Sequence, residues 1–191
     1  MSPRKSTRNQ LIASAEEVFY SRGIGATSVD VVAQEAGVSK PTVYAHFAGK
    51  SELAATALRH RHDQAAAELA DWLAGVEEPG DRPQAVFSWL AHRYRTKGRR
   101  GCAFLNAAAE TVDPEDPVHH AVRAEKRWLL DLLTTLCAEA GTAAPELRAS
   151  QLLLLIDGVA GRVVVEGPQA AARAVSDAAA AAAVLLAAGT S

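Results

Sequence analysis

Between residues 27 and 37, apolar and polar side chains alternate with the spacing of a short α-helix. The apolar positions that share one side of this helix are Val29, Val32, Ala33 and Ala36. Thr27 or Ser28 can accept hydrogen bonds from the free N–H groups at its start, and Asp30 follows Thr27 at the capping-box distance. Gly37 is the residue type that most readily takes the left-handed conformation after a helix. The pattern therefore predicts a short helix that ends at Gly37.

A second short helix is expected directly after this glycine. Val38 is an apolar side chain in the turn, and Ser39 can cap the next helix. Pro41 lies in the first turn of that helix, where proline costs no hydrogen bond. The helix is predicted from Lys40 to Phe47. Two short helices joined by a tight glycine turn are typical of a helix-turn-helix, whose second helix is the recognition helix.

The side chains of the predicted recognition helix divide into two sets. Val43 and Phe47 are four residues apart and can pack inward. The other faces carry a cation, a hydroxyl, a phenol and an imidazole, on Lys40, Thr42, Tyr44 and His46. Such groups contact phosphates and base edges when the helix enters the major groove. The alternative is a small helical bundle in which serine, glycine and proline only separate the helices.

Beyond residue 50 the pattern remains helical, and glycines and prolines divide it into segments. Loops are predicted where these residues cluster, at 75–83, 97–101 and 113–117. Further helices are expected from Lys50 to about Leu73 and over 84–97, 102–110, 118–140, 146–166 and 169–188. With a first helix before Gly23, the chain is expected to be all-α, with about nine helices.

The segment 118–140 has the clearest amphipathic pattern. Its apolar stripe contains Val118, Ala121, Val122, Glu125, Trp128, Leu129, Leu132, Leu133, Leu136 and Ala140. Arg123, Lys126 and Arg127 fall mainly outside this stripe. The segment 146–166 is apolar nearly all round, so it needs cover on more than one side, by its own core and by a partner.

The last two predicted helices together suit a dimer interface. Segment 169–188 is rich in alanine, which adds little bulk but allows close helix approach. Interface residues are expected at Leu152, Ile156, Val159, Val163, Ala178 and Leu185. Gly158 and Gly161 each cost a helix about 1 kcal/mol relative to alanine, and close packing is the expected compensation. The alternative for the alanine-rich segment is a surface helix of high intrinsic propensity.

The charge of the chain is divided between its two ends. The 191 residues are 49% hydrophobic and carry a formal charge of −2. Residues 1–62 hold 8 Lys+Arg against 5 Asp+Glu, or +3, and the remaining residues hold 12 against 17, or −5. The basic N-terminal segment favours contact with phosphate, and the acidic remainder does not. Arg4, Lys5 and Arg8 form either a flexible arm near the DNA backbone or a solvated terminus.

Secretion and membrane insertion are not indicated. No apolar run follows Met1, and the apolar stretch from Leu152 to Val165 is interrupted by Asp157 and Arg162. We therefore expect a cytoplasmic protein that makes no membrane contact. Cys102 and Cys137 are too few for a disulfide framework.

Catalysis and metal binding are not indicated either, and we expect no enzyme, no cofactor and no metal site. No motif links Cys102 to a histidine base. The neighbouring histidines His60 with His62 and His119 with His120 do not share a helix face, so they are poor metal ligands. A redox-sensing role for Cys102 or Cys137 is the better alternative, and it requires an exposed thiol of low pKa. An enzyme in the C-terminal part is a further alternative.

The run from Arg8 to Leu53 resembles the DNA-binding domain of the TetR family of transcriptional regulators. The resemblance rests on the first helix with Gly23, on Thr27, on the segments VAQEAGVS and TVYAHF, and on Lys50 to Leu53. It implies that phosphates are bound by Thr27, Tyr44, His46 and Lys50 and that bases are read by Lys40, Pro41 and Thr42. The capping residues Ser28 and Ser39 complete the expected DNA-binding set.

The resemblance also implies an all-helical homodimer with a ligand site in its C-terminal domain. We expect a helix-turn-helix domain over 1–48 and an effector-binding and dimerisation domain over 49–191, joined by a helix at about 49–73. The segment RGCAFLNAAAE at 100–110 is similar to a stretch found in some TetR-type C-terminal domains. Candidate pocket residues are Trp72, Phe87, Tyr94, Cys102, Phe104, Asn106, Glu110, Trp128 and Leu132. Core packing explains each of them equally well.

These observations together predict a one-component transcriptional regulator. We expect a repressor that binds a palindromic double-stranded DNA operator as a homodimer. A small apolar or amphipathic effector would release it by binding more tightly to the state that cannot bind DNA.

Overall fold

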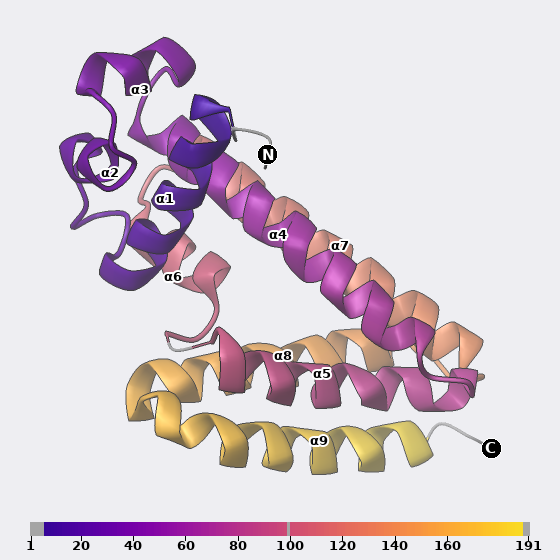
Figure 1. Ribbon diagram of the computed structural model, residues 1–191. Coiled ribbons are helices and arrows are strands. Elements are labelled where there is room, and N and C mark those ends of the chain that lie inside the picture. Colours follow the sequence, from indigo (N-terminus) through magenta and orange to yellow (C-terminus); the bar gives the residue numbers. More distant parts are fainter. Residues whose placement is uncertain (1–5, 99, 189–191) are drawn as a thin grey trace. The chain divides into compact units, whose positions relative to one another are not determined.

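The computed structural model describes residues 6–98 and 100–188, and over these residues the chain is helical (Figure 1). The α-helices are α1 (Thr7–Arg22), α2 (Val29–Glu35), α3 (Lys40–His46), α4 (Lys50–Ala74), α5 (Arg82–Thr96), α6 (Ala103–Glu110), α7 (Pro117–Glu139), α8 (Pro145–Glu166) and α9 (Ala171–Ala187). Two 3₁₀ turns, Pro79–Asp81 and Pro168–Ala170, lead into α5 and α9. Nine α-helices without a strand in the described part confirm the predicted all-α class.

Three of the differences from the predicted helix ends have local reasons. Helix α5 begins at Arg82, two residues early, because Pro83 in a first turn needs no N–H partner. The last helix begins with a 3₁₀ turn, so regular α9 starts only at Ala171. Phe47 lies just outside α3 in an extended conformation, with φ −141° and ψ 134°.

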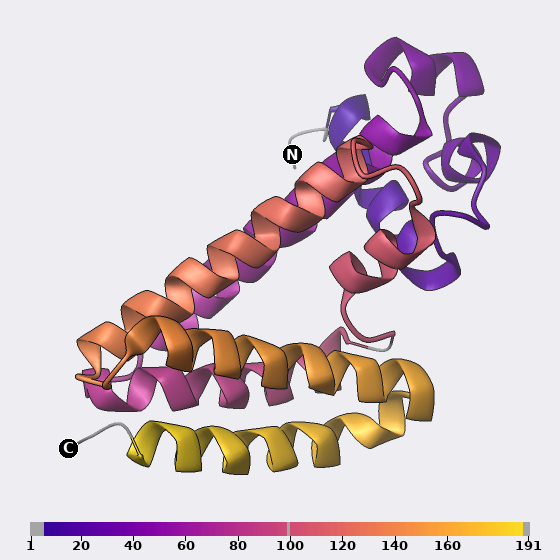
Figure 2. The same cartoon turned by 180° about the vertical axis from the view of Figure 1, so that it is seen from behind.

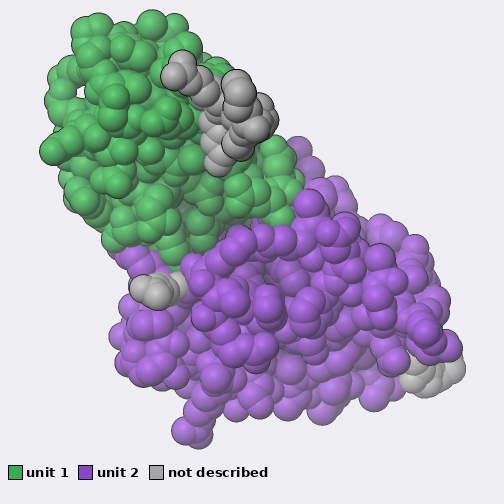
Figure 3. Space-filling model, viewed as in Figure 1, with its two compact units in different colours: residues 1–64, 103–125 green, residues 65–102, 126–191 purple. Residues whose placement is uncertain are grey.

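The chain divides into two compact units (Figure 3). Unit 1 contains residues 1–64 and 103–125, and unit 2 contains residues 65–102 and 126–191. Helices α4 and α7 therefore each contribute to both units. This division is based on packing and places α6 with the first helices. The boundary predicted after residue 48 instead separates DNA binding from effector binding and dimerisation. That functional boundary stays a prediction.

Unit 1 is held together by the apolar faces of its short helices. The buried side chains of α1 are Leu11, Ile12, Ala15, Val18 and Phe19. They share the interior of the unit with Val32 of α2, Val43 of α3, Leu53 of α4 and Phe104 of α6. Burial of one such large side chain contributes about 1.5–3 kcal/mol, so these few residues suffice to hold short helices that would not persist alone.

The turn between α2 and α3 has the hydrogen bonds of a Schellman motif. The N–H of Gly37 donates to the Gln34 carbonyl at 3.1 Å, and the N–H of Val38 donates to the Ala33 carbonyl at 3.0 Å. Gly37 has a φ of +65°, which only glycine adopts without strain. Ser39 then caps α3 by accepting from the Thr42 N–H at 3.3 Å. Local sequence thus sets the angle between the two helices.

Unit 2 is built around α5, α8 and α9, which run side by side in both views (Figures 1 and 2). Its interior contains an apolar cluster that includes Phe87 of α5, Leu133 of α7 and Leu152 of α8, each with at most 1% of its surface exposed. The alanines of α9 that face this cluster are Ala174, Ala178 and Ala182. Their small side chains let α9 approach α5 and α8 closely.

The predicted stripe of α7 is correct for its apolar members and wrong for one of its basic residues. Val118, Ala121, Val122, Leu129, Leu133 and Leu136 are buried. Lys126, however, is not on the solvated side. Its ammonium donates to the Asp157 carboxylate of α8 at 2.6 Å, and its side chain is only 20% exposed. A long lysine stem can cover apolar surface while its charge finds a partner, which residue spacing alone does not reveal.

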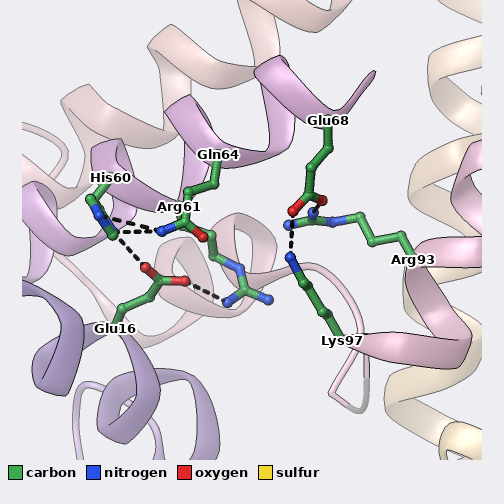
Figure 4. Close-up of polar contacts among 7 residues, drawn as sticks. All are labelled: Glu16, His60, Arg61, Gln64, Glu68, Arg93 and Lys97. Carbon is green, nitrogen blue, oxygen red and sulfur yellow. Dashed lines mark hydrogen bonds and ion pairs between the residues drawn. The ribbon is translucent and has the colours of Figure 1, made fainter. Parts of the chain in front are cut away.

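Figure 4 shows, for each unit, a carboxylate that ties two helices together. In unit 1, Glu16 of α1 pairs with Nδ1 of His60 at 2.8 Å and with Arg61 at 3.1 Å, both on α4. In unit 2, Glu68 of α4 accepts from Arg93 of α5 at 2.9 Å and from Lys97 just after it. Partial burial pushes the pKa of Glu68 up, but the hydrogen bond and charge of Lys97, with the Arg93 charge, lower it overall.

One helical stretch in the described part, Pro168–Ala187, is long and apolar enough to span a membrane by length and composition alone. This stretch packs along α5 and α8 through its alanines. Core helices of soluble proteins pass the same test, so it is weak support for a membrane span.

Candidate nucleic-acid interface

Helix α3 presents most of the side chains predicted to meet DNA. Ser39, Lys40, Pro41, Tyr44 and His46 are exposed, and Thr42 is half-buried. Tyr44 keeps 50% of its surface accessible, which is unusual for so large a ring. Val43 and Phe47 are buried to 1% and 2% and anchor the opposite side. The helix therefore has one apolar face held by unit 1 and one polar face that is free to meet a ligand.

The cation at the start of this face is paired inside the protein. The Lys40 ammonium donates to the Asp30 carboxylate of α2 at 2.8 Å, and both side chains are about half exposed. The hydrogen bond from Lys40 to Asp30, with the Asp30 charge, raises the pKa of Lys40 above its ordinary value. Asp30 has to give up this partner, or share it, when Lys40 meets a base or a phosphate.

Thr27 and Lys50 have internal partners in the loop between α1 and α2. The Thr27 hydroxyl is buried and donates to the Gly23 carbonyl at 2.6 Å. The Lys50 ammonium donates to the Ile24 carbonyl at 2.9 Å and to the Thr27 carbonyl at 3.2 Å. These contacts give both residues a role in holding the loop. Their direct contact with phosphate stays a prediction, and Ser28, which is exposed and caps α2, lies beside them.

The basic N-terminal residues are only partly described. Arg4 and Lys5 lie outside the described residues. Arg8 is exposed in the first turn of α1, with its guanidinium 5.2 Å from the centre of the Phe47 ring. This cation–π contact places a positive charge beside the end of α3.

The predicted pocket residues are divided between the two units. Phe104, Asn106 and Glu110 belong to unit 1, and the other six, Trp72, Phe87, Tyr94, Cys102, Trp128 and Leu132, belong to unit 2. Phe87 is a buried core residue, and Tyr94, Trp128 and Leu132 pack partly buried against the same core. Trp72 is 37% exposed and lies against the ring of His92 at 5.6 Å between centroids. Glu110 is exposed and accepts from the Gly25 N–H at 2.7 Å. A pocket role for this set stays a prediction.

The two cysteines have different surroundings. Cys137 is fully buried in the core of unit 2, and burial raises the pKa of its thiol. Cys102 is half-buried, and its sulfur lies 3.9 Å from the Lys126 ammonium that Asp157 holds. Of the two thiols, Cys102 is therefore the less buried one, and a lysine ammonium lies close to its sulfur.

Most of the residues of α8 and α9 predicted for a dimer interface are buried inside the protomer. Leu152, Val159, Val163 and Ala178 are buried in the protomer's own core, and Ile156 and Leu185 are half-buried. The exposed positions of α8 form a different stripe, which contains Leu147, Leu154, Gly158, Gly161 and Val165. Because α8 is apolar on several faces, the sequence could not show which face the protomer itself covers.

Sequence reasoning missed the partners of several functional candidates. Opposite charges on the two helices of the motif could have indicated the pairing of Asp30 with Lys40. The spacing 147, 154, 158, 161 and 165 follows one helix face and could have marked the exposed stripe. The contact of Glu110 with Gly25 joins residues 85 positions apart, and no local signal announces it.

The helix-turn-helix region is similar to a described protein family. The sequence model of the family "Bacterial regulatory proteins, tetR family" matches residues 11–57. The transcriptional activator FasR of Mycolicibacterium smegmatis is 35% identical over 94 residues, which cover 47% of this chain and 43% of that protein. The transcriptional repressor BdcR of Escherichia coli is 33% identical over 115 residues, which cover 60% of this chain and 57% of that protein. The match thus spans about half the length of these curated relatives.

Similarity to solved structures extends over nearly the whole chain. A TetR-family transcriptional regulator from Streptomyces coelicolor is 30% identical, with a TM-score of 0.87 over 97% of this chain and 96% of that one. A TetR transcriptional regulator from Chloroflexus aurantiacus is 25% identical, with a TM-score of 0.76 over 93% and 92% of the two chains. These four relatives and structures are all named as regulators of transcription, and none as an enzyme.

Proposed function

Because the chain belongs to the TetR family of transcriptional regulators, we propose that it is a repressor that binds a palindromic operator as a homodimer and is released by a small apolar or amphipathic effector. Such a protein acts on DNA in the cytoplasm. The single observation that carries the proposal is the polar face of α3, where Lys40, Tyr44 and His46 stay exposed while Val43 and Phe47 anchor the helix. A rigid helix that offers a cation, a phenol and an imidazole at one surface suits a major groove.

Binding to DNA is tested with two sources of duplex. Mobility-shift assays use the DNA that flanks the protein's own gene and, separately, duplexes recovered from a random library by the wild-type protein. The proposal is supported by specific binding whose log Kd rises linearly with the logarithm of the salt concentration. If neither source yields a sequence bound better than random DNA, the proposal is refuted.

The exposed side chains of α3 are expected to divide between phosphate and base contacts. Tyr44→Phe removes a hydroxyl that would donate a hydrogen bond to a phosphate, so it should weaken binding by a similar factor on every DNA sequence. Lys40→Ala should also relax sequence preference, because a lysine at the start of a recognition helix faces base edges. The readout is the ratio of Kd values for the selected duplex and for versions with single base changes. Equal ratios in both variants would contradict this division of roles.

The exposed stripe of α8 supports a homodimer as the operator-binding form. Leu154 keeps 70% of its surface exposed and Val165 keeps 84%. Between them, a Cβ added at Gly158 or Gly161 meets nothing within 4 Å, so no contact within the described part of the protomer explains these two glycines. A second copy of the same stripe would cover the leucine and valine and allow the helices to approach at the glycines. We therefore propose that α8 and the exposed side of α9 form the interface.

The interface is tested with a charged substitution on α8 and a matched control on α7. Leu154→Glu places a charge on the exposed stripe and should convert the dimer to monomer in sedimentation velocity. Thr135→Glu puts the same charge at an exposed polar position of α7, outside the proposed interface, and should leave the dimer unchanged. A wild-type protein that is monomeric at micromolar concentration would refute the homodimer.

Repression and activation are distinguished in a reporter strain, because the named relatives include an activator and a repressor. With a reporter gene behind the selected operator, a repressor lowers expression when it is produced. Release is tested with a library of small apolar and amphipathic compounds. A true effector raises the melting temperature of the protein and weakens its DNA affinity, because it must bind the two states unequally.

A thiol switch is the second candidate function, and the surroundings of Cys102 suit such a switch better than those of Cys137. The Lys126 ammonium lies 3.9 Å from the Cys102 sulfur, whereas burial raises the pKa of the Cys137 thiol. A thiolate reduces hydrogen peroxide to hydroxide and becomes a sulfenic acid. If the switch exists, peroxide should abolish DNA binding by the wild type and by Cys137→Ser but not by Cys102→Ser. An unchanged Kd for the oxidised wild type would exclude it.

A further inference from the structure

The carboxylate of Glu110 contacts a loop that is distant in sequence. Glu110 is the last residue of α6, and its Oε2 accepts from the Gly25 N–H at 2.7 Å, across 85 positions of the chain. Both residues belong to unit 1. A carboxylate at the C-terminal end of a helix is unfavourably placed in the helix dipole, so helix stability does not explain this residue.

The loop leaves space for this carboxylate. Gly23 has a φ of +91°, and a Cβ added there would lie 2.9 Å from one Glu110 oxygen and 3.0 Å from the other. The positive φ by itself requires glycine here, and the absence of a Cβ leaves room for the Glu110 carboxylate. A Cβ on Gly25 would be 3.6 Å from Oε2, an ordinary contact.

Lys50 and Thr27 donate to three carbonyls of the same loop. The Lys50 ammonium donates to the carbonyls of Ile24 and Thr27, and the Thr27 hydroxyl donates to the carbonyl of Gly23. An anion from α6 thus holds one amide of the loop, and a cation from α4 holds two of its carbonyls. The loop runs directly into Ser28, which caps α2.

We propose that Glu110 is a positioning residue for DNA binding: it acts through Gly25 to hold the 23–27 loop, and with it the start of α2 and the Lys50 ammonium, in the conformation that binds the DNA backbone. The proposal rests on the DNA-binding part of the proposed function. Without this contact the loop would sample other conformations, and binding would have to restore the one shown here. The cost appears as weaker DNA affinity and not as loss of the fold, because Glu110 is an exposed residue.

The test compares three variants on a duplex selected by the wild-type protein. Glu110→Ala removes both the acceptor and the charge. Glu110→Gln removes the charge but keeps an oxygen that can accept from the Gly25 N–H. Glu17→Ala removes a charge from an exposed position of α1 and serves as the control for simple repulsion between acidic groups and DNA. Should the alanine variant not fold, Glu110→Ser replaces it.

Kd for the duplex, melting temperature and exchange of the Gly25 amide proton are measured for each variant. We expect Glu110→Ala to raise Kd by about 3- to 10-fold, the effect of one modest hydrogen bond, and to speed exchange at Gly25. Its melting temperature should stay close to that of the wild type, and Glu110→Gln should restore Kd to within about twofold. A general loss of structure would instead lower the melting temperature of both Glu110 variants together.

Two results would overturn the inference while the proposed function stands. The first is wild-type DNA affinity in Glu110→Ala. The second is tighter binding in Glu110→Ala, Glu110→Gln and Glu17→Ala alike, which would mean that Glu110 acts only as a repelling charge. Failure of the wild-type protein to select any duplex has a different meaning, because it refutes the proposed function itself.

Discussion

Replacing Gly158 and Gly161 by alanine should have opposite effects on the protomer and on the dimer. Both residues lie inside α8 and are exposed, and an added Cβ at either meets nothing within 4 Å. Alanine is more favourable than glycine in a helix by about 1 kcal/mol, so the pair should stabilise an isolated protomer by about 2 kcal/mol. For a chain of this size, that gain raises the melting temperature by about 4–8 °C.

The same two methyl groups should weaken the proposed dimer. If a second α8 packs on the glycines, each methyl enters a close helix contact, and overpacking typically costs about 1–3 kcal/mol. Even about 1.4 kcal/mol raises the dissociation constant of the dimer tenfold. Sedimentation velocity over a dilution series measures this constant, and thermal unfolding at a concentration where the variant is monomeric measures the gain in the protomer.

Thr135→Ala is the matched control, because Thr135 is exposed on α7 and alanine is also the better helix former there. It should raise the melting temperature slightly and leave the dissociation constant unchanged. If the double glycine variant behaves in the same way, with a higher melting temperature and an unchanged dimer, the helices do not cross at Gly158 and Gly161 and that part of the reasoning is refuted.

Three further predictions concern burial, charge and pH. Leu152→Ala should lower the free energy of unfolding by about 2–5 kcal/mol, because Leu152 is fully buried. Leu154→Ala should change the free energy of unfolding of a monomer by less than about 0.5 kcal/mol and weaken only the dimer. Urea unfolding measures the first effect and sedimentation measures the second. Asp30→Asn should tighten DNA binding, because Lys40 no longer needs to leave an ion pair; an unchanged or higher Kd would show that Asp30 positions Lys40 for DNA. Lys97 and Arg93 lower the pKa of Glu68 below its ordinary value of 4.5, so ionised Glu68 stabilises the fold above pH 4.5 and this contribution disappears as the pH falls below it. Glu68→Gln should therefore make the free energy of unfolding less pH-dependent between about pH 5 and 3. An identical pH profile of stability in the variant and the wild type would contradict this assignment.

The helix-turn-helix could be predicted in detail because its signals are local. Ser39, Pro41 and Gly37 each act within one turn of the residues they organise, and the structure shows the expected caps and the expected left-handed glycine. The spacing of Val43 and Phe47 likewise indicated the buried side of α3. Helix bounds were less exact where proline changes the first turn, as at Arg82 and Pro168.

The partners of polar residues could not be predicted in the same way. The spacing of α7 puts Lys126 mainly outside the apolar stripe, yet its ammonium pairs with Asp157 on α8. Lys50 and Thr27 were expected to bind phosphate, and the structure gives both a partner in the 23–27 loop. Each of these contacts joins residues on different helices, so it depends on how those helices pack and not on the period of either one.

The sequence by itself determined the helices, their order and the family resemblance, because caps, breakers and apolar periodicity act over a few neighbouring residues. Only the tertiary structure decided which apolar face of α8 is covered, with Leu152 inside and Leu154 outside, since several faces of that helix are equally apolar. It also decided that Glu110 belongs with Gly25. A contact between such distant positions exists only after the chain has folded, because packing of the core offsets the loss of chain entropy that brings them together.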